Sequence, residues 1–267
     1  MYKAFYGLTE RPFSKTPDPR FLFLSRGHAE ALARLLHAVE ERDIVLLTGG
    51  IGCGKTTLSR ALMDELNESF MVVLLTNPRL TPLEFLRTLA YRLDIEQPAE
   101  YKSELLEQLG GRLYQLYREG VHPVLIIDEA QLIPHKDTFD EIRLLTNFQL
   151  DDGNLLSVVL MGQPELRTRL AHPVYEPLRQ RIGIHFDLGP LNEAEAGLYL
   201  RHRIRCAGGS EDLFQADALR EVALFSGGIP RKINQVAALA LLEGFGRGSV
   251  RIDADIIAEV VAELREL

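Results

Sequence analysis

The stretch GGIGCGKT, at residues 49–56, constrains this chain more than any other part of its sequence. It follows a wholly apolar run, IVLLTGG, and it precedes a segment with helical spacing at residues 56–67. Glycines let consecutive backbone N–H groups curl around phosphate oxygens, and the N-terminus of the next helix adds partial positive charge. The pattern G-x-x-x-x-G-K-[ST] between a strand and a helix therefore predicts a phosphate-binding loop. The residues expected to hold the ligand are Gly49, Gly50, Ile51, Gly52, Cys53, Gly54, Lys55, Thr56 and Thr57.

A second motif supplies the acidic groups that such a loop needs. The apolar run at residues 124–128 ends in Asp128 and is followed by Glu129. A carboxylate at the end of a buried strand is costly unless it meets a cation. We expect Lys55 to reach the β- and γ-phosphates, and Thr56 and Asp128 to hold Mg²⁺. Glu129 is then placed to polarise the attacking water.

The hydrophobic pattern predicts the fold class. Four short apolar runs, at residues 44–50, 71–76, 124–128 and 155–162, are typical of strands covered on both faces. Helical spacing lies before and between them at residues 28–42, 56–67, 81–93, 103–117 and 138–147. This alternation predicts an α/β fold with a parallel sheet sandwiched by helices.

The strands stop after about Pro190, and four helical segments follow at residues 193–206, 216–225, 230–243 and 253–267. Prolines and aromatic residues dominate the first 27 positions, which favours an extended arm over regular structure. We therefore predict three parts: an N-terminal arm at 1–27, an α/β nucleotide-binding core at 28–190 and a small all-α domain at 191–267.

Three further sites carry polar side chains that can act on a phosphate. Gln163 follows a core strand next to the Asp128 strand, and we expect it to contact the γ-phosphate or its water; a simple polar turn is the alternative. Arg179 and Arg181, in PLRQRI, are candidates for an arginine finger in a neighbouring subunit's site, or else form a solvated basic turn. Arg231 opens a helix of the second domain and either swings over the phosphates or stays on the surface.

Composition limits the kinds of binding partner and the cellular compartment that we expect for this chain. Thirty basic and 38 acidic residues give a net charge of -8, which argues against a histone-like protein but leaves room for a local basic stripe. The two cysteines and seven histidines show no metal-ligand spacing, so we interpret the histidines as surface or turn residues and expect a reducing compartment. No run is apolar enough for a signal peptide or a membrane span, which predicts a soluble, cytoplasmic chain. The candidate stripe consists of Arg201, Arg203 and Arg205 with Arg179 and Arg181.

With these motifs in this order, the sequence resembles the AAA+ ATPases. More narrowly, it resembles the ATPase module of the general secretion pathway protein A (ExeA) family, which includes MshM of pilus biogenesis. The resemblance covers essentially all 267 residues, through FYGLTERPFSKTPDPRFLFLS, GHAEALARL, the loop, IIDEAQ, IRLLTNFQ, VLMGQPELRTRL, LRQRI and GGIPRKIN. It implies that Lys55 and Thr56 are the Walker A pair, Asp128 and Glu129 the Walker B pair, Gln163 sensor 1, Arg181 or Arg179 the arginine finger, and Arg231 sensor 2.

The resemblance also implies what the protein does. It predicts a P-loop ATP hydrolase with a helical lid, which needs ATP and Mg²⁺. The protein is expected to form a homo-oligomer, with a hexameric ring as the default. Its expected partner is an envelope assembly protein of a secretion or pilus machine. Full-length members continue into a membrane helix and a periplasmic region, so inner-membrane association through a partner or a C-terminal region is expected. Transposition regulators of the TnsC, TniB and IstB type share much of the pattern and form ATP-dependent filaments on duplex DNA, which is the alternative. A third possible function is a nucleotide-gated scaffold that hydrolyses ATP slowly.

Overall fold

The computed structural model describes residues 1–14, 19–150 and 153–266, so positions 15–18 of the arm, 151–152 of the core and the final leucine lie outside the described residues. The chain divides into two compact units, each of which is described by itself. The helical unit comprises Met1–Ala29, Gly50–Thr57 and Gly189–Leu267, and the sheet unit comprises Glu30–Gly49 and Leu58–Leu188.

A five-stranded parallel sheet, in the order β2-β3-β6-β1-β7, forms the centre of the sheet unit. The central strands β1 and β6 are buried along their whole length, which explains their continuous apolar runs. All five strands run in the same direction, so Gly49, Asp128 and Gln163 lie together along the carboxyl ends of the strands. The strands are β1 (Ile44–Gly49), β2 (Phe70–Leu75), β3 (His122–Ile127), β6 (Ser157–Gly162) and β7 (Ile182–Leu188).

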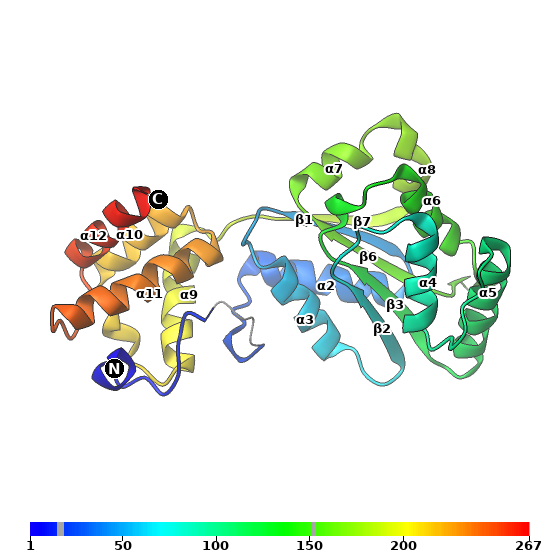
Figure 1. Ribbon diagram of the computed structural model, residues 1–267. Helices are drawn as coiled ribbons and strands as arrows, with labels where there is room; N and C mark the ends of the chain where they lie inside the picture. The colour runs from blue at the N-terminus through cyan, green and yellow to red at the C-terminus, as the bar shows by residue number, and fades with distance from the viewer. Residues whose placement is uncertain (15–18, 151–152, 267) are drawn as a thin grey trace. The chain divides into compact units, whose positions relative to one another are not determined.

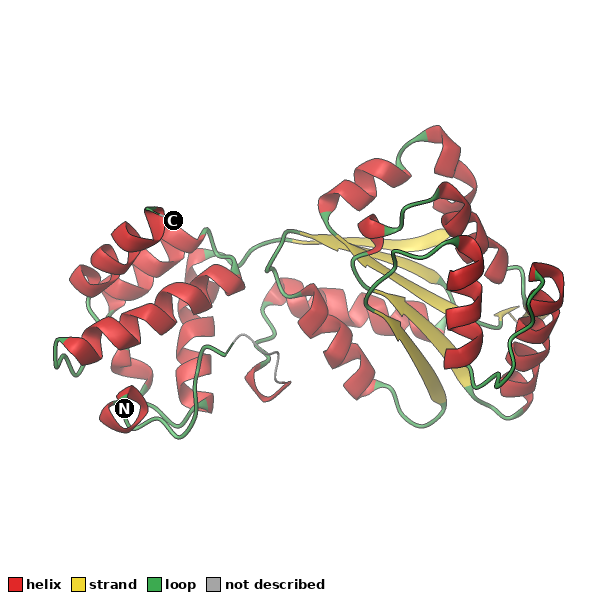
Figure 2. Cartoon of the chain, viewed as in Figure 1, coloured by secondary structure: helices red, strands yellow, loops and turns green. Residues whose placement is uncertain are grey.

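Helices cover both faces of this sheet, as the sequence predicts (Figures 1 and 2). Leucines and aromatics of five of these helices, among them Phe85, Leu109 and Phe139, share one buried core with the strands. Local signals fix the helix starts: Thr81 caps α4 through a reciprocal capping box with Glu84, and Pro82 occupies the first turn. The helices are α2 (Arg26–Glu40), α3 (Lys55–Glu65), α4 (Pro82–Arg92), α5 (Lys102–Arg118), α6 (Lys136–Leu145), α7 (Pro164–Leu170) and α8 (Glu176–Arg179).

The fifth strand, β7, is a correction, because the last strand predicted from the sequence covers residues 155–162. β7 pairs in parallel with β1 and forms one edge of the sheet. Its apolar residues at 182, 184, 186 and 188 alternate with Gly183, His185 and Asp187, the pattern of a strand with one covered face. Arg179 and Arg181 therefore lie just before the last strand of the sheet. A short hairpin of β4 (Gln149–Leu150) and β5 (Gly153–Asn154) completes the strands of the described residues.

Four long helices build most of the helical unit (Figure 2). They are α9 (Glu193–Cys206), α10 (Ala216–Ser226), α11 (Pro230–Gly246) and α12 (Ala254–Arg265), close to the predicted segments. Asn192 caps α9 in a capping box with Glu195, and Gly227 ends α10 in the left-handed conformation. Their inner faces meet in a separate core that includes Leu200, Val222 and Ile233.

The N-terminal arm packs into the same core. It contains α1 (Tyr2–Phe5) and a 3-10 turn at Pro19–Phe21. Tyr6, Phe13 and Phe21 are buried among the helices, and the Tyr6 hydroxyl donates a hydrogen bond to the Ser249 carbonyl at 3.0 Å. The aromatic residues of the arm therefore serve as its anchors. Across the described residues, every helix falls short of the length and apolar character needed to cross a bilayer.

Candidate functional site

The loop that follows β1 has the conformation that its glycines permit. Gly52 and Gly54 have φ values of +81° and +107°, which side-chain-bearing residues rarely adopt. α3 begins at Lys55, so the positive end of its helix dipole falls at the loop. The Lys55 side chain is 6% exposed, and its ammonium group donates to the Gly50 carbonyl at 3.1 Å. The loop thus carries a lysine, an exposed Thr56 and a helix N-terminus, the three elements of a phosphate-binding site.

His28 holds this loop from within the helical unit. Its Nε2 donates to the Cys53 carbonyl at 2.9 Å; since a carbonyl only accepts, Nε2 carries the proton and Nδ1 accepts from the Ser25 hydroxyl at 2.7 Å. Burial lowers the pKa of His28, which keeps the ring neutral. A Cβ on Gly54 would lie 2.8 Å from Nε2, so the loop can approach the ring only because that position is glycine. The interpretation of His28 as a surface or turn residue is therefore wrong.

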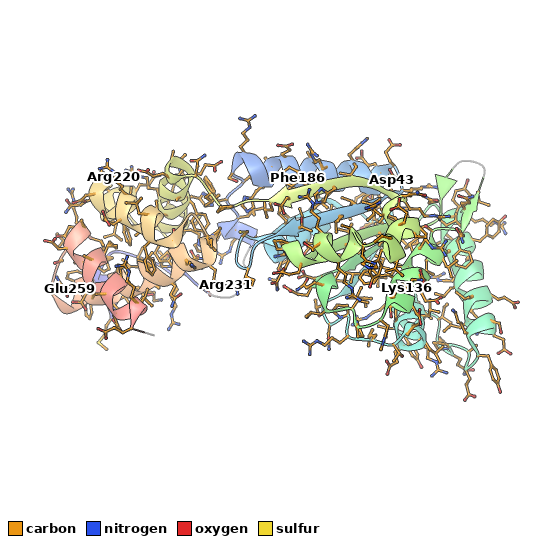
Figure 3. All side chains as sticks on the ribbon, turned by 90° about the horizontal axis from the view of Figure 1, so that it is seen from above. Asp43, Lys136, Phe186, Arg220, Arg231 and Glu259 are labelled. Carbon is orange, nitrogen blue, oxygen red and sulfur yellow. The ribbon has the colours of Figure 1, made fainter. Side chains whose placement is uncertain are left out.

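The first turn of α11 also contacts the loop. The backbone N–H of Arg231 donates to the Gly52 carbonyl at 3.3 Å, and a Cβ on Gly52 would lie 2.7 Å from that of Arg231. Pro230, which has no N–H to donate, occupies the first position of the helix. The Arg231 side chain is exposed at the start of α11 (Figure 3). The structure therefore brings the predicted sensor arginine to the loop.

A small pocket lies beside the loop within the same unit. Aromatic and apolar side chains provide most of its wall, among them Phe21, Leu191, Tyr199 and Pro230. The Tyr199 hydroxyl donates to Asn234 at 2.9 Å, and burial raises its pKa. The pocket adjoins the phosphate loop, because Gly54 and Thr57 also line it.

Arg203 also lines this pocket, which corrects its place in the predicted basic stripe. It is 8% exposed, its Nε donates to the Pro12 carbonyl at 2.7 Å, and its guanidinium lies 4.6 Å from the centre of the Phe21 ring. Arg205 is exposed but pairs with Glu211 at 3.1 Å. Of the α9 stripe, only Arg201 and Arg205 reach the surface.

The acidic pair lies where β3 ends in the sheet unit. Asp128 is 5% exposed, and its Oδ1 accepts from the backbone N–H of Glu129 at 2.9 Å. Glu129 adopts a left-handed backbone with φ of 53°, rare for a residue with a side chain. Its Oε2 accepts from the Gln163 amide at 3.2 Å and from the Gln131 amide at 2.5 Å. The structure therefore joins Glu129 to Gln163. It also adds Gln131, the last residue of IIDEAQ, to which the sequence alone assigns no role.

The two arginine-finger candidates lie elsewhere in the sheet unit. Arg179 is exposed at the end of α8 and forms an ion pair with Glu176. Arg181 is exposed and donates to the Thr146 hydroxyl at 2.6 Å. Within the described residues, neither side chain hydrogen bonds to Glu129. The arginine-finger role concerns a second subunit, so for both residues it stays a prediction.

The donor types fit the magnesium ion that the sequence predicts. Mg²⁺ takes hard oxygen ligands, and it usually keeps several waters while bound by one or two carboxylates and by substrate phosphates. Thr56 offers a hydroxyl on the loop, and Asp128 offers a carboxylate at the end of β3. Cysteine or histidine ligands, which softer metals prefer, play no part in this set.

Comparison with known proteins identifies relatives along the whole chain. The family model described as an AAA domain matches residues 37–170. General secretion pathway protein A of Aeromonas hydrophila is 38% identical over 273 residues, covering 100% of this chain and 49% of that protein. An uncharacterized HTH-type transcriptional regulator of Methanocaldococcus jannaschii is 23% identical over 274 residues, covering 88% of this chain and 66% of that protein. The chain thus spans about half and about two thirds of these two relatives.

Solved structures with a similar fold are more distant in sequence. The ORC2 protein of Aeropyrum pernix, in ADPNP and ADP complexes, has a TM-score of 0.69 at 19% identity, over 95% of this chain and 71% of that one. The RuvB Holliday junction branch migration motor of Thermotoga maritima has a TM-score of 0.62 at 22% identity, over 91% and 70%. These likenesses show the fold, which is that of P-loop AAA+ proteins. Together with the matched AAA domain and the relationship of the whole chain to about half of general secretion pathway protein A, they establish that this chain belongs to the AAA+ family.

Proposed function

We propose that this protein is an ATP hydrolase that works with Mg²⁺. One observation carries the proposal: Glu129 and Gln163 are hydrogen bonded at the sheet edge where β1 also ends, and the chain passes from Gly49 directly into the loop. A carboxylate held by an amide at that edge suits a group that orients water. The same loop offers what a triphosphate needs, namely N–H groups, a helix N-terminus and Lys55.

The residues divide the reaction among them. The loop N–H groups and Lys55 bind the phosphates, and the pocket beside Tyr199 packs against the base. Thr56 and Asp128 would hold Mg²⁺, which would neutralise charge on the phosphates. Glu129 orients a water and accepts its proton as the water oxygen bonds to the γ-phosphorus and the bond to the bridging oxygen of ADP breaks. Gln163 donates its amide toward the γ-phosphate or the water.

Two variants test the proposal. Lys55→Ala should lose most ATP affinity, because the cation that reaches the phosphates is gone. Glu129→Gln should bind ATP like the wild type but hydrolyse it at least 100-fold more slowly, within the range of roughly 10²–10⁴ that proton-transfer groups supply. Glu107→Gln, an exposed glutamate on α5, is the matched control. Binding is measured with a fluorescent ATP analogue and turnover by phosphate release. Wild-type hydrolysis by Glu129→Gln would contradict the assignment.

For the biological process, we propose that the ATPase drives assembly of a cell-envelope machine, acting from the cytoplasm at the inner membrane through a partner protein. The relationship to general secretion pathway protein A over the whole chain supports this. The alternative of an ATP-dependent regulator on duplex DNA loses support from the burial of Arg203, which removes the centre of the expected basic stripe. Salt-sensitive, ATP-dependent filaments on duplex DNA would contradict the envelope proposal.

A further inference from the structure

Gln131 lies between the two polar groups that the proposed function assigns to the water and the γ-phosphate. Its Nε2 donates to Oε2 of Glu129 at 2.5 Å, and its Oε1 accepts from the backbone N–H of Gln163 at 3.1 Å. The Gln163 side chain closes the triangle by donating to the same Oε2 at 3.2 Å. A side-chain amide carries a donor and an acceptor on separate atoms, so Gln131 can donate on one side and accept on the other.

The surroundings are shaped to admit this side chain. A Cβ on Gly162 would lie 2.7 Å from Oε1 of Gln131, so only glycine at the end of β6 leaves room for the bridge. The backbone of the same segment is fixed from α7, where the Arg169 guanidinium donates to the carbonyls of Ile133 at 2.5 Å and Gln131 at 3.5 Å. The helix that begins after Gln163 therefore holds the segment that carries Gln131.

The bridge leaves one carboxylate oxygen of Glu129 for chemistry. The side-chain amides of Gln131 and Gln163 both donate to Oε2, and among the described residues no side chain donates to Oε1. With the left-handed backbone at Glu129, the carboxylate is held in one orientation by its own main chain and by two amides. A misplacement of about 1 Å at a reacting group costs about 10²-fold in rate, so fixing this carboxylate matters for turnover more than for nucleotide binding.

We propose that Gln131 is a positioning residue that locks Glu129 to Gln163, so that the water-orienting carboxylate and the phosphate-facing amide act as one rigid pair. This inference rests on the proposed function. It predicts a change in kcat without a change in ATP affinity, because Gln131 bonds to Glu129 and Gln163 and has no assigned part in holding the phosphates.

The test compares Gln131→Ala and Gln131→Glu with the wild type. Gln131→Glu keeps the length of the side chain and can accept from the Gln163 N–H, but at neutral pH it cannot donate to Glu129. Both variants should lose about 10- to 100-fold in kcat while the Kd for ATP stays within about twofold. Gln115→Ala is the matched control, because the Gln115 amide donates to Glu119 at 2.8 Å on the exposed face of α5. Thermal unfolding of every variant is measured alongside.

The outcomes separate the two proposals. Turnover within twofold of the wild type in Gln131→Glu, or a parallel loss of kcat and ATP affinity in both variants, would overturn the role of Gln131. If Gln131→Ala fails to fold, the isosteric Gln131→Glu decides by the same criteria. Glu129→Gln is run beside them: a wild-type rate there overturns the proposed function itself, whereas its loss together with an active Gln131→Glu overturns only the positioning role.

Discussion

The helical unit and the sheet unit hold their functional groups by different means. In the helical unit the phosphate loop is held through its backbone carbonyls, with His28 donating to Cys53 and the first turn of α11 donating to Gly52. In the sheet unit the groups at the strand ends are held through side-chain amides around Glu129. Backbone contacts fix the shape of a binding surface, whereas side-chain amides fix the direction of one reactive group. We therefore expect damage to the helical unit to appear in nucleotide affinity and damage to the sheet unit to appear in turnover.

The largest expected effect concerns a second subunit, whose arginine would add to turnover a contribution that neither unit of the same chain supplies. Arg181→Ala should lower specific activity by about 10³-fold, the lower range for arginine fingers, and wild-type activity should rise with protein concentration. Mixing Arg181→Ala with Lys55→Ala should restore part of the turnover, because each supplies the group that the other lacks. Phosphate release across a dilution series measures both. Full activity at concentrations where sedimentation shows a monomer would rule out the arginine finger.

A smaller effect tests whether damage to the helical unit lowers nucleotide affinity. His28→Leu removes the donor to the Cys53 carbonyl and leaves a buried acceptor without its partner, a loss of about 1–3 kcal/mol. We expect the Kd for ATP to rise about 10-fold, which corresponds to 1.4 kcal/mol, with kcat at saturating ATP nearly unchanged. His37→Leu, an exposed histidine on the same helix α2, is the control. A drop in kcat with unaltered affinity would show that the two units do not divide the work as described.

The smallest effect is a pH dependence confined to the sheet unit. Burial, with a smaller contribution from Arg42, lowers the pKa of His122 from 6.5 to about 4, and its Nε2 lies 2.7 Å from the Ser157 hydroxyl. Between pH 6.5 and 4 the unfolded chain binds the proton and the folded chain does not, so the free energy of unfolding falls as the pH drops and levels off below 4.

Because this ring is partly exposed, we expect a loss of only about 1 kcal/mol from this residue between pH 7 and 5. Urea unfolding of the wild type and of His122→Gln at both pH values measures it, with His37→Gln as the exposed control. The His122→Gln chain should show the shallower dependence. An equal slope in both chains would mean that the ring does not stay neutral in the folded sheet unit.

The sequence predicts the parts of the fold that local pattern controls. The four predicted strands and the nine predicted helical segments lie within a few residues of their observed bounds, because apolar runs and helical spacing leave strong signals. β7 is missed because an edge strand needs only one apolar face, and its alternating pattern is short. Gln163 lies beside Glu129 as the strand order requires.

What the sequence does not reveal depends on contacts between distant residues. Gln131 gains its role from Gln163, 32 positions away, and from the missing side chain of Gly162. His28 is buried because the loop at Cys53 folds over it. Arg203 resembles an exposed helix position by its spacing from other arginines, but the arm covers it. The roles of Arg179 and Arg181 stay predictions, since they concern a second subunit.

The burial of the arm has a consequence for how the chain is made. Tyr6 bonds to Ser249 and Arg203 to Pro12, so one core is closed by segments that lie 243 and 191 positions apart in the sequence. At roughly 5–20 residues per second, the aromatic side chains of the arm wait about 10–50 s on the ribosome before α11 and α12 exist to cover them. Partners so far apart in sequence also make the closing step slow relative to the folding of local helices. The loop depends on contacts from His28 and Arg231 within this late-closing core, so the nascent chain acquires the support for nucleotide binding only after the helices α11 and α12 have been synthesised.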